Sequence, residues 1–328
     1  MNYRKLGKTN FNVSEIALGT WQVGGGWGQT FDHQTASRII HTALDSGVNF
    51  IDTADVYDAG LSEAAVGKAI RERSERIYVA TKCGRQIQPH VHEAYTPEIL
   101  RKFVEASLKN MALDTIDLIQ LHCPPTPVYK RAEIFGLFDR LKEEGKIQHL
   151  GVSVETVEEA EMALEFPNVS TVQIIFNMFR LKPSEKFFAI AQNSNCGIIV
   201  RVPLASGLLT GKLHPSSSFP ENDHRTFNRQ GEAFDKGETF SGVPFELGLE
   251  AAEELKLLVG NQASLAAFAL RWVLMFPEVS TVIPGASKPA QVQENIAAAE
   301  LPALKPYQMD AVKAIYEKYI KKEIHHLW

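Results

Sequence analysis

Residues 96–123 read TPEILRKFVEASLKNMALDTIDLIQLHC, a helical pattern followed directly by a strand pattern. Thr96 is a suitable helix N-cap, and Pro97 suits the first helical position. The apolar residues that follow recur at helical spacing: Ile99, Phe103, Val104, Leu108 and Met111. The final eight residues, IDLIQLHC (116–123), form a nearly continuous apolar run, which is typical of a strand covered on both faces. The stretch therefore predicts one helix–strand unit of a parallel α/β fold.

The same alternation extends over most of the chain. Eight strands are expected, at residues 14–20, 48–54, 76–83, 116–123, 149–153, 171–177, 197–203 and 280–286. Helical segments lie between them, including 184–195 and 264–276. Such alternation forms either a closed (β/α)8 TIM barrel or a doubly wound sheet, and eight units without a break in composition favour the barrel. We therefore expect one α/β barrel domain spanning residues 1–328.

Two segments lie outside this pattern. The residues before the first strand look like an N-terminal β-hairpin that could plug the amino end of the barrel. Residues 213–246 form a long irregular segment, and a loop of this length inside a compact domain is usually functional or mobile. Its Arg225 and Arg229 either close over a pyrophosphate or are simply solvated, and the sequence leaves both readings open.

Composition excludes several functional classes. The 328 residues carry a net charge of −5 without a long basic run, so neither nucleic acid nor an anionic membrane surface is expected as a partner. There is no secretory signal core and no apolar segment of about 18 residues, which indicates a cytoplasmic protein without a membrane span. Cys83, Cys123 and Cys196 are far apart, and the histidines at 325–326 lack further ligands at metal spacing. Neither a disulfide framework nor a metal site is expected.

Ionisable side chains fall where three neighbouring strands end. Asp52 lies at the end of the second expected strand, with Tyr57 in the loop after it, and Lys82 and His122 end the next two strands. The chemistry of (β/α)8 barrels sits at these strand ends, so the four side chains are expected to converge. The set suits carbonyl reduction, because the developing alkoxide needs a proton donor.

The phenol of Tyr57 is the candidate donor. Its ordinary pKa is about 10, and bringing it near 7 takes about 4 kcal/mol. One ammonium at ~4 Å supplies about that much at an effective dielectric near 20. We expect Lys82 to lower the pKa of Tyr57 and Asp52 to fix and partly neutralise Lys82. His122 would orient the carbonyl oxygen.

These residues, together with longer motifs, resemble the aldo-keto reductases over nearly the whole chain. The matching segments are DTADVYDAG (52–60), ATK (80–82), SLKNMALDTIDLIQLHCPP (107–125), GKIQHLGVS (145–153), PLASGLLTGK (203–212) and IPGASKPAQVQENI (283–296). The resemblance implies a catalytic tetrad of Asp52, Tyr57, Lys82 and His122, and hydride transfer to an aldehyde or ketone. The same family includes the β subunits of voltage-gated potassium channels, so a cofactor-bearing regulatory subunit with slow turnover is the alternative. An unrelated barrel lyase or isomerase is a third reading.

The cofactor signal lies late in the sequence. No GxGxxG motif follows a strand, which argues against a Rossmann module. Barrels often bind phosphate through the loops after strands seven and eight, which here carry Ser206-Gly207-Leu208 and Gly285-Ala286-Ser287-Lys288. The second loop opens a helix, whose free N–H groups attract anions, and Lys288 adds a full charge. In the family this segment grips the adenosine 2′-phosphate, so the resemblance implies NADPH (NADP) rather than NADH.

The resemblance implies further cofactor contacts. Ser153 and Gln173 match the residues that hold the nicotinamide carboxamide, and Glu294 and Asn295 would meet the adenine. The other residues expected at the cofactor are Thr20, Trp21, Arg201, Pro203, Leu204 and Gln291.

Three positions depart from the family pattern. Val154 replaces the usual asparagine, Asp58 replaces the usual glycine, and Arg201 stands where an aromatic residue commonly stacks on the nicotinamide. A guanidinium plane can also stack, but its charge disfavours the oxidised ring and can recruit an anionic substrate; otherwise Arg201 is paired with a nearby acid. Neither the carbonyl substrate nor the oligomeric state can be read from the sequence. The candidate pocket walls are Trp21, Trp27, Val56 and residues 123–130.

Overall fold

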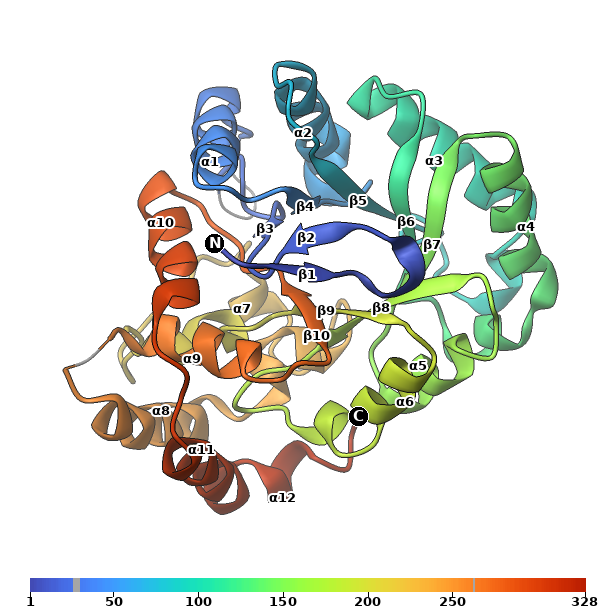
Figure 1. Cartoon of the computed structure of the whole chain (residues 1–328). Helices are drawn as coiled ribbons and strands as arrows, with labels where there is room; N and C mark the ends of the chain where they lie inside the picture. The colour runs from blue at the N-terminus through green and yellow to red at the C-terminus, as the bar shows by residue number, and fades with distance from the viewer. Residues whose placement is uncertain (26–29, 262) are drawn as a thin grey trace.

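The computed structural model describes residues 1–25, 30–261 and 263–328, in which parallel strands form a barrel inside a ring of helices (Figure 1). The strands follow one another in the order β10-β9-β8-β7-β6-β5-β4-β3, and each neighbouring pair is parallel. Their bounds are β3 (Leu18–Gly19), β4 (Phe50–Asp52), β5 (Tyr78–Cys83), β6 (Ile116–His122), β7 (Ile147–Ser153), β8 (Val169–Ile175), β9 (Gly197–Arg201) and β10 (Val279–Val282). Backbone bridges join Ile16 to Val282 and Gly19 to Gly285, so the sheet closes on itself. The predicted (β/α)8 barrel is confirmed.

The strands at the closing seam are shorter than predicted. Only Leu18–Gly19 of residues 14–20 is a barrel strand, because Ser14 already pairs with Tyr3 in a separate two-stranded sheet. The last strand ends at Val282 rather than at residue 286. Pro284 follows, and a proline has no amide hydrogen to donate to a neighbouring strand.

Helices follow the strands and cover the outside of the barrel (Figure 1). Their bounds are α1 (His33–Asp45), α2 (Leu61–Arg71), α3 (Pro97–Met111), α4 (Ala132–Glu143), α5 (Val157–Ala163), α6 (Phe187–Asn193), α8 (Phe245–Val259), α9 (Leu265–Leu274) and α10 (Pro289–Ala297). Two more, α11 (Pro306–Tyr319) and α12 (Lys321–Ile324), follow the last barrel helix. No helix in the described ranges is long and apolar enough to cross a membrane.

Helix α3 begins as its sequence predicts but buries a slightly different face. The Thr96 hydroxyl accepts a hydrogen bond from the Ile99 amide, and Pro97 is the first helical residue. The buried positions are Leu100, Val104, Ser107 and Met111, whereas Ile99, Phe103 and Leu108 are half-buried. The stripe that faces the barrel therefore includes a serine, which a search for apolar residues passes over.

The N-terminal hairpin closes the amino end of the barrel, as expected. It consists of β1 (Tyr3–Lys5) and β2 (Asn12–Ser14), and in Figure 1 it lies across the middle of the barrel. Its buried side chains share one hydrophobic cluster with residues of the barrel strands: Leu6, Phe11, Val13, Ala17, Phe50, Ala80, Leu118, Ile199 and Ile283. Since this end is filled with apolar side chains, polar chemistry is confined to the opposite end.

The long segment after β9 is folded rather than extended. It contains α7 (His224–Phe227) and two short 3-10 turns, Lys236–Glu238 and Phe240–Gly242. The C-terminal residue Trp328 fixes it, because its indole N–H donates to Asp235 at 3.0 Å. The guanidinium of Arg180 lies 3.9 Å from the centroid of the same indole ring. This segment therefore has a defined position over the carboxyl end of the barrel.

Candidate active site

Lys82 on β5 forms a buried ion pair with Asp52 at the end of β4. Its Nζ donates to Asp52 Oδ1 at 2.5 Å and to the Thr53 carbonyl at 2.8 Å. The two side chains are only 1% and 2% exposed. The other carboxylate oxygen of Asp52 accepts amide hydrogens from Gln120 and Gln173, each at 2.9 Å. Strand-borne partners therefore surround the carboxylate and hold it in one orientation.

Tyr57 lies in the loop after β4, with its hydroxyl beside Lys82. Lys82 Nζ donates to Tyr57 Oη at 3.3 Å. The ring of His122 stands at 85° to the phenol, with the ring centroids 6.2 Å apart. The turn after Tyr57 needs a left-handed backbone at Asp58 (φ 48°) and Ala59 (φ 52°), which leads the chain into α2. The four side chains predicted to be catalytic thus meet at one place.

The pKa of the Tyr57 phenol is shifted in the direction opposite to the one predicted. Burial raises the pKa of Tyr57, and the Lys82 ammonium offsets this only in part. Burial also opposes the charge on Lys82, but Asp52 and Tyr57 outweigh it and raise the pKa of Lys82. The predicted lowering of the Tyr57 pKa was therefore wrong, because desolvation and the charge of Asp52 outweigh the effect of the Lys82 ammonium.

His122 is a neutral imidazole in this setting. Burial, Arg85 and Lys82 together hold its pKa well below the ordinary range. Its Nδ1 has no hydrogen-bond partner among the described residues, and the residue lines a cavity. A neutral imidazole has one N–H to donate, so it can orient a substrate oxygen without carrying a charge.

The two residues predicted to hold the nicotinamide carboxamide, Gln173 and Ser153, have different surroundings. Gln173 lines the cavity but also donates to Asp52. Ser153 is 1% exposed, and its hydroxyl lies 3.5 Å from the thiol of Cys123. Gln120, which supports Asp52, was missed at the sequence level. Its signal was present, because it stands two residues before His122 on one strand and so faces the same side.

One cavity of about 380 Å³ contains most of the predicted site. The predicted residues that line it are Thr20, Trp21, Asp52, Tyr57, His122, Gln173, Arg201, Pro203, Leu204, Ser206, Gly207, Gly285, Gln291, Glu294 and Asn295. The predicted residues outside its lining are Lys82, Ser153, Leu208, Ala286, Ser287 and Lys288. Lys82 lies next to Tyr57 without lining the cavity, whereas Leu208 and Ala286 are buried in the apolar core. Trp27 lies outside the described residues.

The other end of the cavity is formed by the start of α10 and the segment after β9. The Ser287 amide donates to Gln291 Oε1 at 2.8 Å, so Gln291 partly caps its own helix. Arg225 lines the cavity and is held by Asp223, with guanidinium contacts of 2.9 and 2.7 Å. Arg229 does not line it and instead donates to the Arg225 carbonyl. Of the two arginines left open by the sequence, only Arg225 is placed to meet a bound anion.

A second group of buried charges lies beside the catalytic side chains, and we call Arg85, Glu155, Arg201 and Glu238 the arginine–glutamate cluster. Arg201 donates to Glu155 at 2.7 Å, and Arg85 donates to Glu238 at 2.8 Å. Glu238 reaches the cluster from the long segment after β9, and its carbonyl accepts a hydrogen bond from the Ser206 hydroxyl. Apart from Arg201, these residues were missed because they lie on loops with no distinguishing motif.

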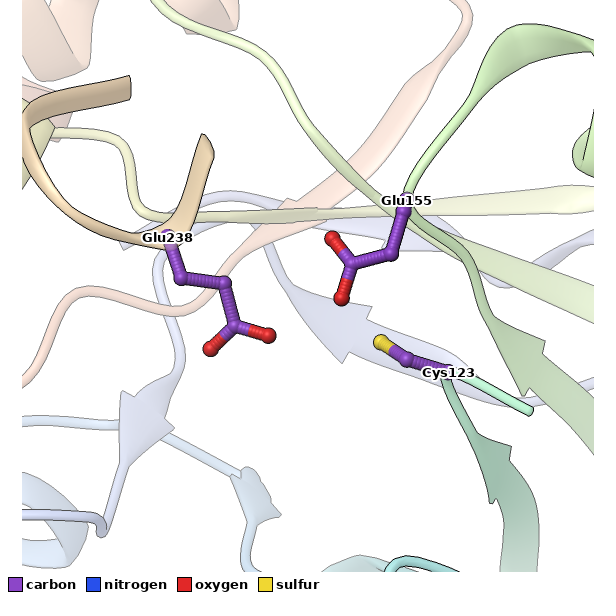
Figure 2. Close-up of side chains that lie close together, drawn as sticks. All are labelled: Cys123, Glu155 and Glu238. Carbon is purple, nitrogen blue, oxygen red and sulfur yellow. The ribbon is translucent and has the colours of Figure 1, made fainter. Parts of the chain in front are cut away.

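Cys123 lies at the edge of this cluster. Figure 2 shows its thiol and the carboxylates of Glu155 and Glu238 pointing toward one another, and their ligand atoms all lie within 4.8 Å. Burial raises the pKa of the thiol above its usual range. Two arginines already engage the carboxylates, so a metal ion would have to displace an existing cation.

The cavity fits a nicotinamide dinucleotide. Its lining includes Tyr57 and His122 and also Arg225, Lys212 and residues of α10. One cavity thus combines a proton donor with an anion-binding end, as a hydride carrier with a pyrophosphate requires.

Comparison with known proteins agrees with this geometry. Residues 15–317 match the model of the aldo/keto reductase family. Aldo-keto reductase YhdN of Bacillus subtilis is 32% identical over 305 residues, covering 89% of this chain and 87% of that protein. NADH-specific methylglyoxal reductase of Escherichia coli is 29% identical over 315 residues, covering 89% and 92%. A probable voltage-gated potassium channel subunit beta of Arabidopsis thaliana is 29% identical over 340 residues, covering 98% of each chain. The structure of glycerol dehydrogenase AKR11B4 from Gluconobacter oxydans superposes with a TM-score of 0.78 at 32% identity, covering 99% and 96%.

The fold and the site together define an NAD(P)H-dependent oxidoreductase built on a (β/α)8 barrel. The chain belongs to the aldo/keto reductase family.

Proposed function

We propose that this protein is an NADPH-dependent reductase of aldehydes or ketones, acting as a single barrel domain in the cytoplasm. The observation that carries the proposal is the position of Lys82 Nζ, which lies 2.5 Å from Asp52 and 3.3 Å from the Tyr57 hydroxyl. This arrangement supports a phenol that gives up its proton next to a fixed ammonium. When bound, the reduced nicotinamide supplies the hydride.

The remaining chemistry belongs to the chain itself. The raised pKa of Tyr57 keeps the phenol protonated at neutral pH, so the acid is present when a substrate arrives. After the proton leaves, the Lys82 ammonium stabilises the phenolate, and Asp52 keeps that ammonium in place. His122, as a neutral imidazole, holds the substrate oxygen near the phenol by donating its N–H.

The preference for NADPH rests on the start of α10. Lys288 occupies its N-cap position and is exposed, so its charge is available to an adenosine 2′-phosphate. The Escherichia coli relative is NADH-specific by name, which makes this preference a point to measure. We expect Lys288→Met to raise the Kd for NADPH about tenfold, the worth of one charge-assisted contact, and to leave the Kd for NADH unchanged.

The test of the proposal is a panel of aldehydes, ketones and sugars with NADPH or NADH, followed at the nicotinamide absorbance band. Tyr57→Phe is expected to lower kcat by about 10²–10⁴-fold for every substrate reduced, with nearly unchanged cofactor affinity. Tyr78→Phe is the matched control, because Tyr78 stacks on Phe11 at the opposite end of the barrel. Wild-type rates in Tyr57→Phe for every carbonyl would contradict the proposal.

The similarity to a potassium channel β subunit supports a second candidate function, a cofactor-bearing regulatory subunit. Such a protein oxidises one bound NADPH but turns over slowly. A steady-state rate far below the single-turnover rate, together with capture of a membrane protein partner, would favour it. Comparable rates in the two measurements support the enzyme.

A further inference from the structure

Arg201 lines the same cavity as Tyr57 and His122. It is the last residue of β9, paired in register with Ile175 of β8. The residues that follow it, Val202 to Leu204, line the cavity and lead to Ser206 and Gly207 at the anion-binding end. The nicotinamide ring has to lie near Tyr57, where the carbonyl is protonated, while its phosphates lie near α10. Burial lowers the pKa of His122 and the charge of Arg201 adds to this, so Arg201 lies near the part of the cavity that the ring would occupy.

Hydrogen bonds hold the guanidinium of Arg201 in place, although they do not use all of its N–H groups. Its Nη2 donates to Glu155 Oε2 at 2.7 Å and to the Val154 carbonyl at 3.0 Å. Its Nη1 lies 3.7 Å from Glu238 Oε1. The side chain is 9% exposed, yet its Nε has no hydrogen-bond partner among the described residues. The charge is thus fixed in place.

The countercharges of Arg201 are shared with a second cation. Arg85 donates to Glu238 at 2.8 Å, so two guanidinium groups face two carboxyl groups. Burial, with the nearby Glu238, raises the pKa of Glu155 to about 7, although Arg201 opposes this. A raised pKa weakens the countercharge that Glu155 sets against the Arg201 guanidinium.

We infer that Arg201 is a specificity residue that makes the site bind the reduced nicotinamide more tightly than the oxidised one. The inference rests on the proposed function, since it requires a nicotinamide cofactor in the cavity. Oxidation by loss of hydride places a positive charge on the ring, and a fixed guanidinium in the same cavity repels it. At an effective dielectric near 20, two such charges interact strongly enough to change a Kd about tenfold even when half compensated. The consequence is a site that releases its spent cofactor readily and favours reduction.

The experiment measures binding rather than activity. The Kd values of NADPH and NADP⁺ are determined at pH 8 by isothermal titration calorimetry, and their ratio is compared across variants of the full chain. Arg201→Met removes the charge, Arg201→Lys keeps it, and Glu155→Gln removes the countercharge. The double variant Arg201→Met with Glu155→Gln removes both charges, so it carries the test even if Arg201→Met alone fails to fold. Thermal denaturation checks that each variant is folded.

The ratio of the NADP⁺ Kd to the NADPH Kd is expected to fall about tenfold in Arg201→Met, and by a smaller factor in the double variant, which also loses the opposing charge of Glu155. It should stay within about twofold in Arg201→Lys and rise in Glu155→Gln, as Coulomb interactions require. If both affinities weaken equally when Arg201 is lost, so that the ratio does not move, the residue only positions the cofactor and the inference is overturned. If the wild type binds neither NADPH nor NADH, the proposed function itself is wrong, and the inference about Arg201 falls with it.

Discussion

Two groups of buried charges lie side by side at the carboxyl end of this barrel, and they are built in opposite ways. The first is the pair Lys82–Asp52, whose members and supporting amides come from barrel strands. The second is the arginine–glutamate cluster, in which only Arg201 belongs to a strand and the other members come from loops. In the first group every oxygen of Asp52 accepts a hydrogen bond. In the second, the Nε–H of Arg201 has no hydrogen-bond partner within the described part of the chain, and burial raises the pKa of Glu155 to about 7.

The difference shows what each kind of support is suited to. Strands fix a side chain through the register of the whole sheet, so the Lys82–Asp52 pair can hold its geometry through a reaction. Loops bring together charges from distant parts of the chain, and the net charge of such a group depends on which of its members are protonated. The catalytic pair is therefore expected to be rigid, and the charge balance of the cluster is expected to be adjustable.

Breaking the Lys82–Asp52 pair should have the largest effect on stability. Lys82→Met leaves the Asp52 carboxylate buried without its cation, and the free energy of unfolding should fall by about 3–5 kcal/mol. Adding Asp52→Asn removes the stranded charge and should restore a large part of that loss. Urea denaturation of the two variants measures both values, and a double variant no more stable than Lys82→Met would mean that the pair is not the source of the effect.

The pH dependence of stability should distinguish the two groups. Folded Glu155 holds its proton up to a pKa of about 7, whereas unfolded glutamate releases it near 4.3. The folded state binds more protons between these values, so stability falls as pH rises from about 4.5 to 7. Glu155→Gln should remove on the order of 1–3 kcal/mol of that fall.

The measurement is the unfolding free energy of wild type and Glu155→Gln at several pH values. Burial and the Glu63 carboxylate also raise the pKa of Asp55 to about 7, and this slope is common to both proteins. The difference between the two proteins therefore isolates Glu155. Parallel stability curves would show that Glu155 does not titrate in this range.

Removing a charge from the arginine–glutamate cluster should lower stability less than removing Lys82 from the Lys82–Asp52 pair. Glu238→Gln keeps the shape of the side chain but leaves Arg85 facing a neutral amide, which should cost about 1–2 kcal/mol. Because Glu238 ties the segment 213–246 to the barrel, limited proteolysis within that segment should become faster. An unchanged cleavage rate would mean that Trp328 and Asp235 hold the segment without it.

The smallest effect is expected on the barrel's outer surface. Arg101 pairs with Glu144 through two contacts of 2.6 and 2.7 Å, but both side chains are partly exposed. Water and salt screen such pairs, so Arg101→Ala should change neither stability measurably nor the affinity for cofactor. This variant is the matched control for the buried charges, and a loss as large as that of Lys82→Met would remove burial as the explanation.

Particular residues show where the sequence was sufficient and where it was not. The strand ends predicted Asp52, Tyr57, Lys82 and His122 as a group, and the structure brings them together. The predicted lowering of the Tyr57 pKa did not follow, because burial depends on everything packed around the ring. Lys288 and Ser287 were expected at the cofactor, but they lie outside the cavity lining.

By itself the sequence determined the barrel, its plugged amino end and the strand-borne catalytic side chains. The helices follow from a 3.6-residue periodicity and the strands from short, nearly continuous apolar runs, and both patterns can be read along the chain. Only the tertiary structure decided that Arg201 meets Glu155 and Glu238, and that Trp328 secures the segment carrying Glu238. Those partners are separated by tens of residues and joined by loops without a repeat, so their meeting follows from the closure of the barrel and not from any local pattern.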